Sequence, residues 1–196
     1  MTPTKLLHLD SSILGDNSAS RAISAAAVER LRELHPGVEV THRDLAAAPI
    51  DHLTLEAYGQ LAEGEDLREF LEADIVVIGA GFYNFTIPTQ LKAWLDRIVV
   101  RGTTFSYDEN GVKGLVAGKR VVVALARGNV YHSGSPFAAY EHGETLLRTI
   151  LGFIGLGDAQ YIIAEGIGRG DDARKAAIEG AVAEARQLTA GEPVTA

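Results

Sequence analysis

The sequence predicts an α/β fold, a three-layer sandwich in which a five-stranded parallel sheet lies between helices on both faces. Short apolar runs rich in valine and isoleucine, typical of strands buried on both faces, alternate with longer segments of helical periodicity. Strands that alternate with helices require crossover connections and therefore a parallel sheet. The chain has 196 residues, with no internal repeat and no low-complexity linker, so we expect one domain over residues 1–196.

Five segments have the character of strands. Four are short apolar runs, whereas the second along the chain is weaker and alternates apolar with polar residues. In chain order the expected strands are 5–9, 38–45, 74–80, 120–126 and 159–166. For five such strands we expect the sheet order 2-1-3-4-5.

Helical patterns lie between the strands. Segment 18–34 carries an apolar stripe and begins with serines that can cap a helix. The other expected helices lie in segments 51–73, 88–100, 135–155 and 171–188.

Segment 101–119 has neither pattern. Asn110-Gly111 is a strong turn signal between two short stretches of strand character. We therefore expect a hairpin over about 103–116 that projects from the sheet.

Composition excludes several classes of function. The formal net charge of −8, with basic residues scattered along the chain, opposes binding to nucleic acid or anionic lipid. No apolar stretch approaches the ~18–20 residues of a membrane span, and the N-terminus lacks the features of a signal peptide, so we expect a cytoplasmic protein. The absence of cysteine excludes disulfides and thiolate catalysis.

Ligands of open α/β sheets bind beyond the carboxyl ends of the strands, where the strand order reverses. The loop after the first strand, 10–21, holds four serines and leads into a helix. The N–H groups at a helix N-terminus and the serine hydroxyls suit a phosphate, although neither a Walker A motif nor G-x-G-x-x-G is present. The alternative, that these serines only cap the helix, stays open.

The loop after the third strand presents Phe82, Tyr83, Asn84 and Phe85 in succession. A folding core does not need such a group there, whereas a flat ligand with polar edges can use rings on its face and backbone groups at its edge. The alternative places Phe82 and Phe85 in the core and Tyr83 on the surface.

The loop after the fourth strand, 126–136, contains Gly128, which permits close approach of a ligand to the backbone. Arg127 is either an anchor or a solvated side chain. Tyr131 and His132 are positioned to border a substrate pocket.

Side chains able to perform the reaction themselves are scarce. No G-x-S-x-G elbow occurs, and no histidine pair has zinc-ligand spacing with a third ligand, so no metal site is predicted. His8 lies in an expected strand and is interpreted as a satisfied core residue. We therefore predict no catalytic side chain and infer that a cofactor carries the reaction.

Four segments together resemble the FMN-dependent NADH:quinone oxidoreductases called azoreductases, within the flavodoxin-like superfamily. The segments are "SSILGDNSAS", "FYNFTIPTQLKAWLD", "TFSYDENGVKGLVAGK" and "TILGFIGL…AEGI". The resemblance implies a flavodoxin-like fold and bound FMN. It also implies two-electron transfer from NADH, or NADPH, to quinones and azo compounds by a ping-pong mechanism, in a homodimer that shares its active site.

The resemblance also implies roles for individual residues. Cofactor contacts are expected to the phosphate from Ser12, Ser18, Ala19 and Ser20, to the isoalloxazine ring from Phe82, Tyr83, Asn84 and Phe85, and to its pyrimidine edge from Ala126, Arg127, Gly128 and Asn129. Tyr131 and Phe153 are expected at the substrate pocket, with Phe153 either core or interface. Relatives often carry a serine in place of Ala126, and the missing hydroxyl removes a hydrogen bond worth about 0.5–1.5 kcal/mol.

Two alternatives remain on the same fold. One is a flavodoxin-type electron carrier that holds FMN without turning over a substrate, although the first loop lacks the T-x-T-G-N-T pattern. The other is a sensor module without redox activity. Because fold does not determine function, the loops must discriminate among them.

Overall fold

The structure, a computed structural model, describes residues 3–109 and 111–190. A parallel five-stranded sheet in the order β2-β1-β3-β6-β7 forms its centre. The strands are β1 (Lys5–Asp10), β2 (Glu39–Asp44), β3 (Ile75–Gly81), β6 (Arg120–Arg127) and β7 (Gln160–Glu165). Because β4 and β5 belong to a separate hairpin, this order is the expected 2-1-3-4-5, and the flavodoxin-like arrangement is confirmed.

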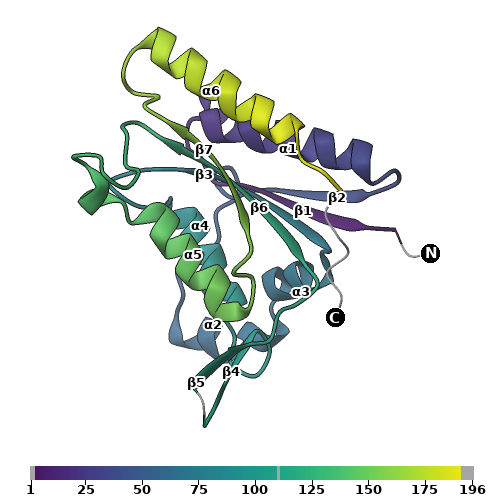
Figure 1. Cartoon of the computed structure of the whole chain (residues 1–196). Coiled ribbons are helices and arrows are strands. Elements are labelled where there is room, and N and C mark those ends of the chain that lie inside the picture. The colour runs from purple at the N-terminus through teal and green to yellow at the C-terminus, as the bar shows by residue number, and fades with distance from the viewer. Residues whose placement is uncertain (1–2, 110, 191–196) are drawn as a thin grey trace.

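Helices cover both faces of the sheet (Figure 1). One face carries α1 (Ala19–Leu34) and α6 (Asp171–Arg186). The other carries α3 (Glu65–Glu72), α4 (Thr89–Ile98) and α5 (Gly143–Ile154).

Each face of the sheet has its own apolar core, because successive side chains of a strand point to opposite faces. Leu6 and Val77 pack under α1 and α6, whereas Leu7 and Val76 pack under the helices of the other face. Every residue of β3 is buried, which explains its continuous apolar run.

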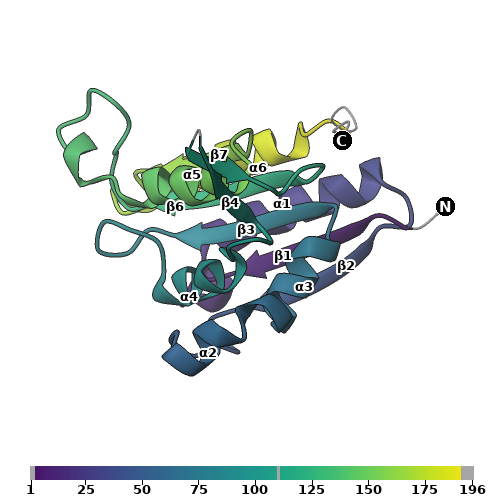
Figure 2. The same cartoon turned by 90° about the horizontal axis from the view of Figure 1, so that it is seen from below.

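Segment 51–73 differs from expectation, because it holds two short helices instead of one. These are α2 (Leu55–Gly59) and α3, separated by a 3₁₀ turn, Leu61–Glu63, and by Gly64 (Figure 2). Gly64 has an extended backbone and serves as the N-cap of α3, so one continuous helix is interrupted at this residue.

The helix expected over 135–155 begins only at Gly143. The carboxylate of Glu141 accepts hydrogen bonds from the backbone N–H groups of Gly143, Glu144 and Thr145. These are the groups that a helix N-terminus leaves without partners, so the side chain of Glu141 fixes where α5 starts.

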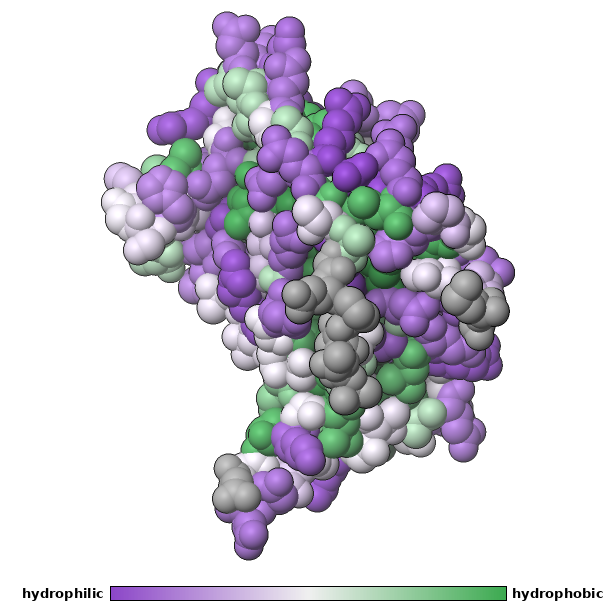
Figure 3. All heavy atoms as spheres, turned by 45° about the vertical axis from the view of Figure 1, so that its right-hand side comes forward, coloured by the Kyte–Doolittle hydropathy of each residue, from purple (hydrophilic) through white to green (hydrophobic). Residues whose placement is uncertain are grey.

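The expected hairpin is present as antiparallel β4 (Phe105–Asp108) and β5 (Gly111–Gly114), although Asn110 lies outside the described residues. The hairpin projects from the body of the molecule (Figure 3). At its base the N–H of Val116 donates to the carbonyl of Ile154, which ties it to the end of α5. In the described ranges, none of the helices has both the length and the apolar character that crossing a membrane requires.

Candidate functional site

An open cavity of about 260 Å³ lies at the carboxyl ends of β1, β3 and β6, where the three predicted loops converge. Its lining residues are Ser12, Leu14, Ser18, Ala19, Ser20, Gly81, Phe82, Tyr83, Ala126, Gly128, Ile167, Gly168 and Arg174. Hollows of similar size occur elsewhere, for example one of about 330 Å³ beside α2. The position of this cavity at the strand-order reversal, and not its size, marks it as the candidate site.

The first loop brings buried serines to the N-terminus of α1. Ser18 is the N-cap, and its hydroxyl accepts a hydrogen bond from the N–H of Arg21 at 3.3 Å. The hydroxyls of Ser18 and Ser20 lie 3.1 Å apart. Ser18 therefore caps the helix, and it also lines the cavity.

The side chain of Arg21 connects this loop to strand β2. Its guanidinium donates to the carbonyl of Ser12 at 2.9 Å and forms a two-point ion pair with Asp44 of β2, at 2.7 and 2.8 Å. The hydrogen bonds from Arg21 hold the pKa of Asp44 at about 2. This charged brace ties the loop to the edge strand of the sheet.

The second loop contains a tight turn with a strained backbone. Tyr83 and Thr86 exchange two backbone hydrogen bonds, at 2.9 and 3.1 Å, around Asn84 and Phe85. Both central residues have positive φ, 46° and 74°, which is the pattern of a type I′ turn. Phenylalanine in this conformation is unfavourable, and such strain is concentrated at functional sites.

The turn directs the ring of Tyr83 back over the end of β3. A Cβ on Gly81 would lie 2.8 Å from that ring, so only glycine allows this placement. The Tyr83 hydroxyl lies 2.8 Å from that of Ser12, which joins the first two loops across the cavity.

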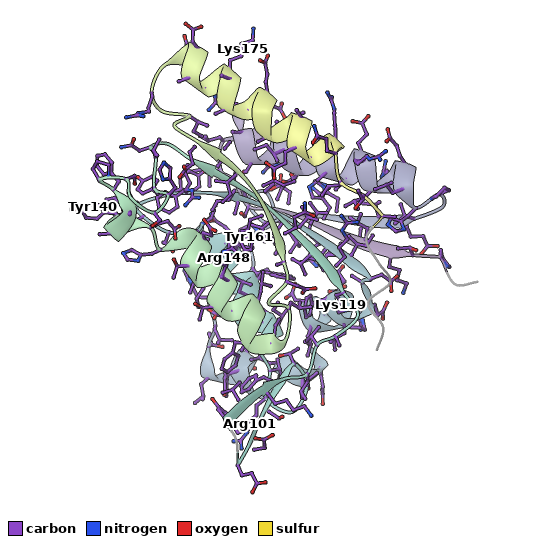
Figure 4. The ribbon with its side chains drawn as sticks, in the orientation of Figure 1. Arg101, Lys119, Tyr140, Arg148, Tyr161 and Lys175 are labelled. Atoms are coloured by element: carbon purple, nitrogen blue, oxygen red, sulfur yellow. The ribbon has the colours of Figure 1, made fainter. Side chains whose placement is uncertain are left out.

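A row of aromatic rings continues outward from the cavity. Phe82 lies 4.6 Å from Tyr131 between ring centroids, and Phe85 lies 5.3 Å from Tyr140. Phe137 stands between the two tyrosines, at 6.2 and 6.4 Å. Figure 4 shows Tyr140 at the outer tip of the loop that follows β6.

The third loop is held by the loop after β7. The carbonyls of Arg127, Gly128 and Asn129 accept hydrogen bonds from the backbone N–H groups of 166–168. A Cβ on Gly128 would meet nothing within 4 Å, so the backbone there is open toward the cavity.

The side chain of Arg127 is neither solvated nor at the cavity. It is buried among three carboxylates, with Glu144 at 2.9 Å, Glu165 at 3.3 Å and Glu141 at 3.6 Å. Glu165 also accepts the N–H of Tyr131, and Glu141 caps α5. Arg127 therefore fixes the two ends of the third loop.

Not every predicted site residue lines the cavity. Asn84 and Phe85 form the turn beside it, Asn129 binds the N–H of Val130 through its side chain, and Tyr131 packs on Phe82. Phe153 lies at the other end of α5, 4.7 Å from Phe105 between ring centroids, and so at the amino ends of the strands.

Several residues line the cavity although their sequence pattern did not predict it: Leu14, Gly81, Ile167, Gly168 and Arg174. Ile167 and Gly168 follow β7, whose carboxyl end lies at the same edge of the sheet, so the position of the fifth strand was the available signal. Arg174 is the only charged residue among those that line the cavity in the described chain, and its side chain also binds the carbonyl of Asn17.

The arrangement suits recognition better than proton chemistry. Serine hydroxyls, a helix N-terminus and Arg174 offer donors to an anion, and Phe82 and Tyr83 offer faces to a flat ring. Of the residues that line this cavity, none is a histidine or a carboxylate.

Comparison with known proteins assigns the chain to a family. Residues 4–189 match a family model described as a flavodoxin-like fold. A relative from Gluconacetobacter diazotrophicus, named FMN-dependent NADH:quinone oxidoreductase, is 56% identical over 191 residues, covering 90% of this chain and 95% of the relative. A relative of the same name from Methylorubrum extorquens is 50% identical over 201 residues, covering 95% of this chain and 99% of the relative.

Among solved structures, the crystal structure of an azoreductase from Bacillus anthracis strain Sterne is similar, with a TM-score of 0.81. It is 25% identical, and the match covers 94% of this chain and 100% of that chain. The chain therefore belongs to the family of FMN-dependent NADH:quinone oxidoreductases, on the flavodoxin-like fold.

Proposed function

We propose that this protein is an FMN-dependent oxidoreductase that passes two electrons from NADH to quinones and azo compounds. One observation carries the proposal: the loops that match the family converge on one cavity, with a serine-lined helix N-terminus at one wall and aromatic rings at another. The family relationship supports the same cofactor, donor and acceptor.

The serines suit the phosphate of FMN. The Ser18 hydroxyl already accepts from the N–H of Arg21, and it shares one hydrogen bond with Ser20. Whichever hydroxyl donates in that pair, one proton remains for a further acceptor. Together with the helix N-terminus and Arg174, this favours an anion without requiring a lysine.

The opposite side of the cavity suits the ring system. Phe82 and Tyr83 offer aromatic faces, while Gly128 offers open backbone. The cavity volume of about 260 Å³ lies just below the ~300–1,000 Å³ usual for ligand pockets. A single chain therefore covers a ligand as large as FMN only in part.

When bound, FMN would supply the redox chemistry, a two-electron transfer from the donor to the acceptor. The chain's own residues would bind and orient the cofactor. Backbone N–H groups of the open loop at Gly128 would be suited to stabilise negative charge that develops at the edge of the ligand. We infer that donor and acceptor reach the bound cofactor at the same place in turn, as the ping-pong mechanism of the family resemblance implies. Among the described residues that line the cavity, Arg174 is the only cation, and if the phosphate of FMN pairs with it, none remains for a 2′-phosphate, which favours NADH over NADPH.

We propose further that the protein is a homodimer. Phe153 lies beside the hairpin, away from the cavity of its own chain. If Phe153 contacts the substrate, as the family resemblance implies, the pocket that it reaches must belong to a second copy of the chain. Light scattering after gel filtration should give twice the 20.9 kDa of the chain, and a mass of one chain would contradict the dimer. The cytoplasmic location expected from the sequence stays a prediction.

Anaerobic spectroscopy tests the activity. The purified protein loaded with FMN should be yellow, should bleach on addition of NADH, and should regain its colour when benzoquinone follows. A protein that binds FMN but resists bleaching by NADH would support the flavodoxin-type carrier. A protein that does not bind FMN would refute the cofactor assignment.

A further inference from the structure

Two histidines and an aspartate lie together on the α1 face of the sheet. His8 and Asp10 belong to β1, and His42 belongs to the edge strand β2. His8 pairs directly with His42 in the parallel register, and Asp10 lies two residues further along the same face. Zinc-ligand motifs are recognised by the spacing of residues within one segment, so they do not reveal a cluster of side chains that comes together across two strands.

The distances between these side chains match those around a metal ion. Oδ2 of Asp10 lies 3.0 Å from Nε2 of His42, which is a hydrogen bond in the absence of an ion, and 3.4 Å from Nε2 of His8. One ligand atom from each residue lies within 4.8 Å of the other two. A tetrahedral ion with bonds of about 2.0–2.1 Å separates its ligand atoms by roughly 3.3 Å, so two of the three separations already fit.

The hydrogen bonding of the cluster is incomplete without an ion. His8 is 8% exposed, and its buried Nε2 has no hydrogen-bond partner, contrary to its interpretation as a satisfied core residue. A buried ring nitrogen of this kind costs free energy unless something binds it. Because Nε2 faces the Asp10 carboxylate at 3.4 Å, an ion between them would satisfy it.

The surroundings support a metal ligand at Asp10. The other carboxylate oxygen, Oδ1, accepts a hydrogen bond from the buried hydroxyl of Ser24 at 2.9 Å, which fixes the orientation of the carboxylate. The side chain of His42 is 49% exposed, so an ion can enter and keep water as a further ligand. Asp10 itself is buried, which makes a charged partner valuable.

We propose that His8, Asp10 and His42 bind one Zn²⁺ ion, which clamps the edge strand β2 to β1 beneath the first loop. Two imidazoles and one carboxylate are ligands that zinc prefers, and water completes the coordination. The site is separate from the cavity lining, and its role is structural. The rival is a protonated histidine paired with Asp10, which needs no metal.

Isothermal titration of the FMN-loaded protein with Zn²⁺ tests the site. The wild type should bind one ion per chain, and Zn²⁺ should raise its Tm, because an ion that binds only the folded state stabilises it. His42→Gln should weaken binding by at least the ~10–100-fold seen when outer-shell partners are lost, and should abolish the Tm shift. His52→Gln, at an exposed histidine outside the cluster, should behave as the wild type.

Two outcomes would overturn the proposal. One is a wild type that takes up no stoichiometric Zn²⁺, and this result stands even if His42→Gln fails to fold. The other is equally tight binding to wild type and a folded His42→Gln variant. Titration with Co²⁺ gives an independent readout. Co²⁺ bound by two histidines and an aspartate should show visible d–d absorption, whereas a protonated histidine paired with Asp10 would bind no Co²⁺ and give no such absorption.

Discussion

Ser18 and Ser20 carry the most specific local argument for an anion in the cavity. Both side chains are buried, yet their hydrogen bonds to protein groups leave one hydroxyl proton without an acceptor. Because both serines line the cavity, that proton can be donated to an anion bound there.

Ser20→Ala should therefore weaken FMN but not riboflavin. A hydrogen bond to a charged group contributes about 1.5–3 kcal/mol, so we expect the Kd of FMN to rise about 10- to 100-fold. Fluorescence titration of the apoprotein with both flavins measures the two constants, and Ser133→Ala, at an exposed serine, is the control. An equal loss of affinity for FMN and riboflavin would show that the phosphate does not bind at Ser20.

Phe85 combines an exposed ring with an unfavourable backbone. Its φ of 74° costs roughly 1–2 kcal/mol for a residue other than glycine, and its ring packs on that of Tyr140. A strained residue that persists beside the cavity suggests that its ring has a role in ligand contact.

Two variants separate strain from ring contact. Phe85→Gly and Phe85→Ala both remove the ring, but only glycine relieves the backbone, so the glycine variant should be more stable by about 1 kcal/mol. Urea denaturation measures this difference, while steady-state assays should show the same rise in KM for an aromatic acceptor in both variants. Equal stability of the two variants would mean that the turn is not strained.

At the scale of elements, the base of the hairpin rests on the end of α5. A Cβ on Gly114 would lie 2.3 Å from the backbone nitrogen of Gly155. This contact is between backbones, so no side chain can move away to relieve it.

Gly114→Ala should consequently destabilise the protein by about 1–3 kcal/mol, the usual cost of overpacking, and should displace the hairpin from α5. Gly180→Ala is the matched control, since a Cβ there meets nothing within 4 Å and lies inside α6, where alanine is favoured by up to ~1 kcal/mol. Thermal unfolding should place the two variants on opposite sides of the wild type. A neutral Gly114→Ala would show that the two elements are not in close contact.

The start of α5 depends on one ionised carboxylate. Burial raises the pKa of Glu141. Hydrogen bonds from the N–H groups of Glu144 and Thr145, together with the nearby charge of Arg127, lower the pKa by more than burial raises it, so the net shift is downward. A lowered pKa in the folded state contributes stability above the unfolded value of 4.5, and that stability is lost as pH falls through the folded value.

Glu141→Gln should therefore be less stable than the wild type at pH 7 by about 1–2 kcal/mol, and the gap should narrow as pH falls below about 4.5. Denaturant unfolding at several pH values between 7 and 3 gives the comparison. A gap that stays constant over this range would mean that the charge of Glu141 does not contribute.

At the scale of the whole molecule, the sequence predicted what short-range patterns determine. The boundaries of the five parallel strands were each predicted to within one residue, and β3 and β6 are the clearest because they are continuous buried runs. The three loops of the cavity followed from the strand order. Gly64 and Glu141 were missed as boundaries, since their effects depend on backbone conformation and capping contacts.

Contacts across the sheet were beyond sequence reasoning. His42 meets His8 only through the register of β1 and β2, which the sequence does not specify. Arg127 is an anchor of the third loop and not a solvated side chain, but its three carboxylate partners could not be predicted, because they come from α5, the segment before it and β7.

A crystal structure of the FMN-loaded protein would show directly whether the three loops hold the cofactor. We expect the phosphate at the N-terminus of α1, within hydrogen-bond distance of the Ser18 or Ser20 hydroxyl, and the ring system against Phe82, Tyr83 and Gly128. FMN bound at another surface, or bound in this cavity with its phosphate turned away from α1, would contradict it.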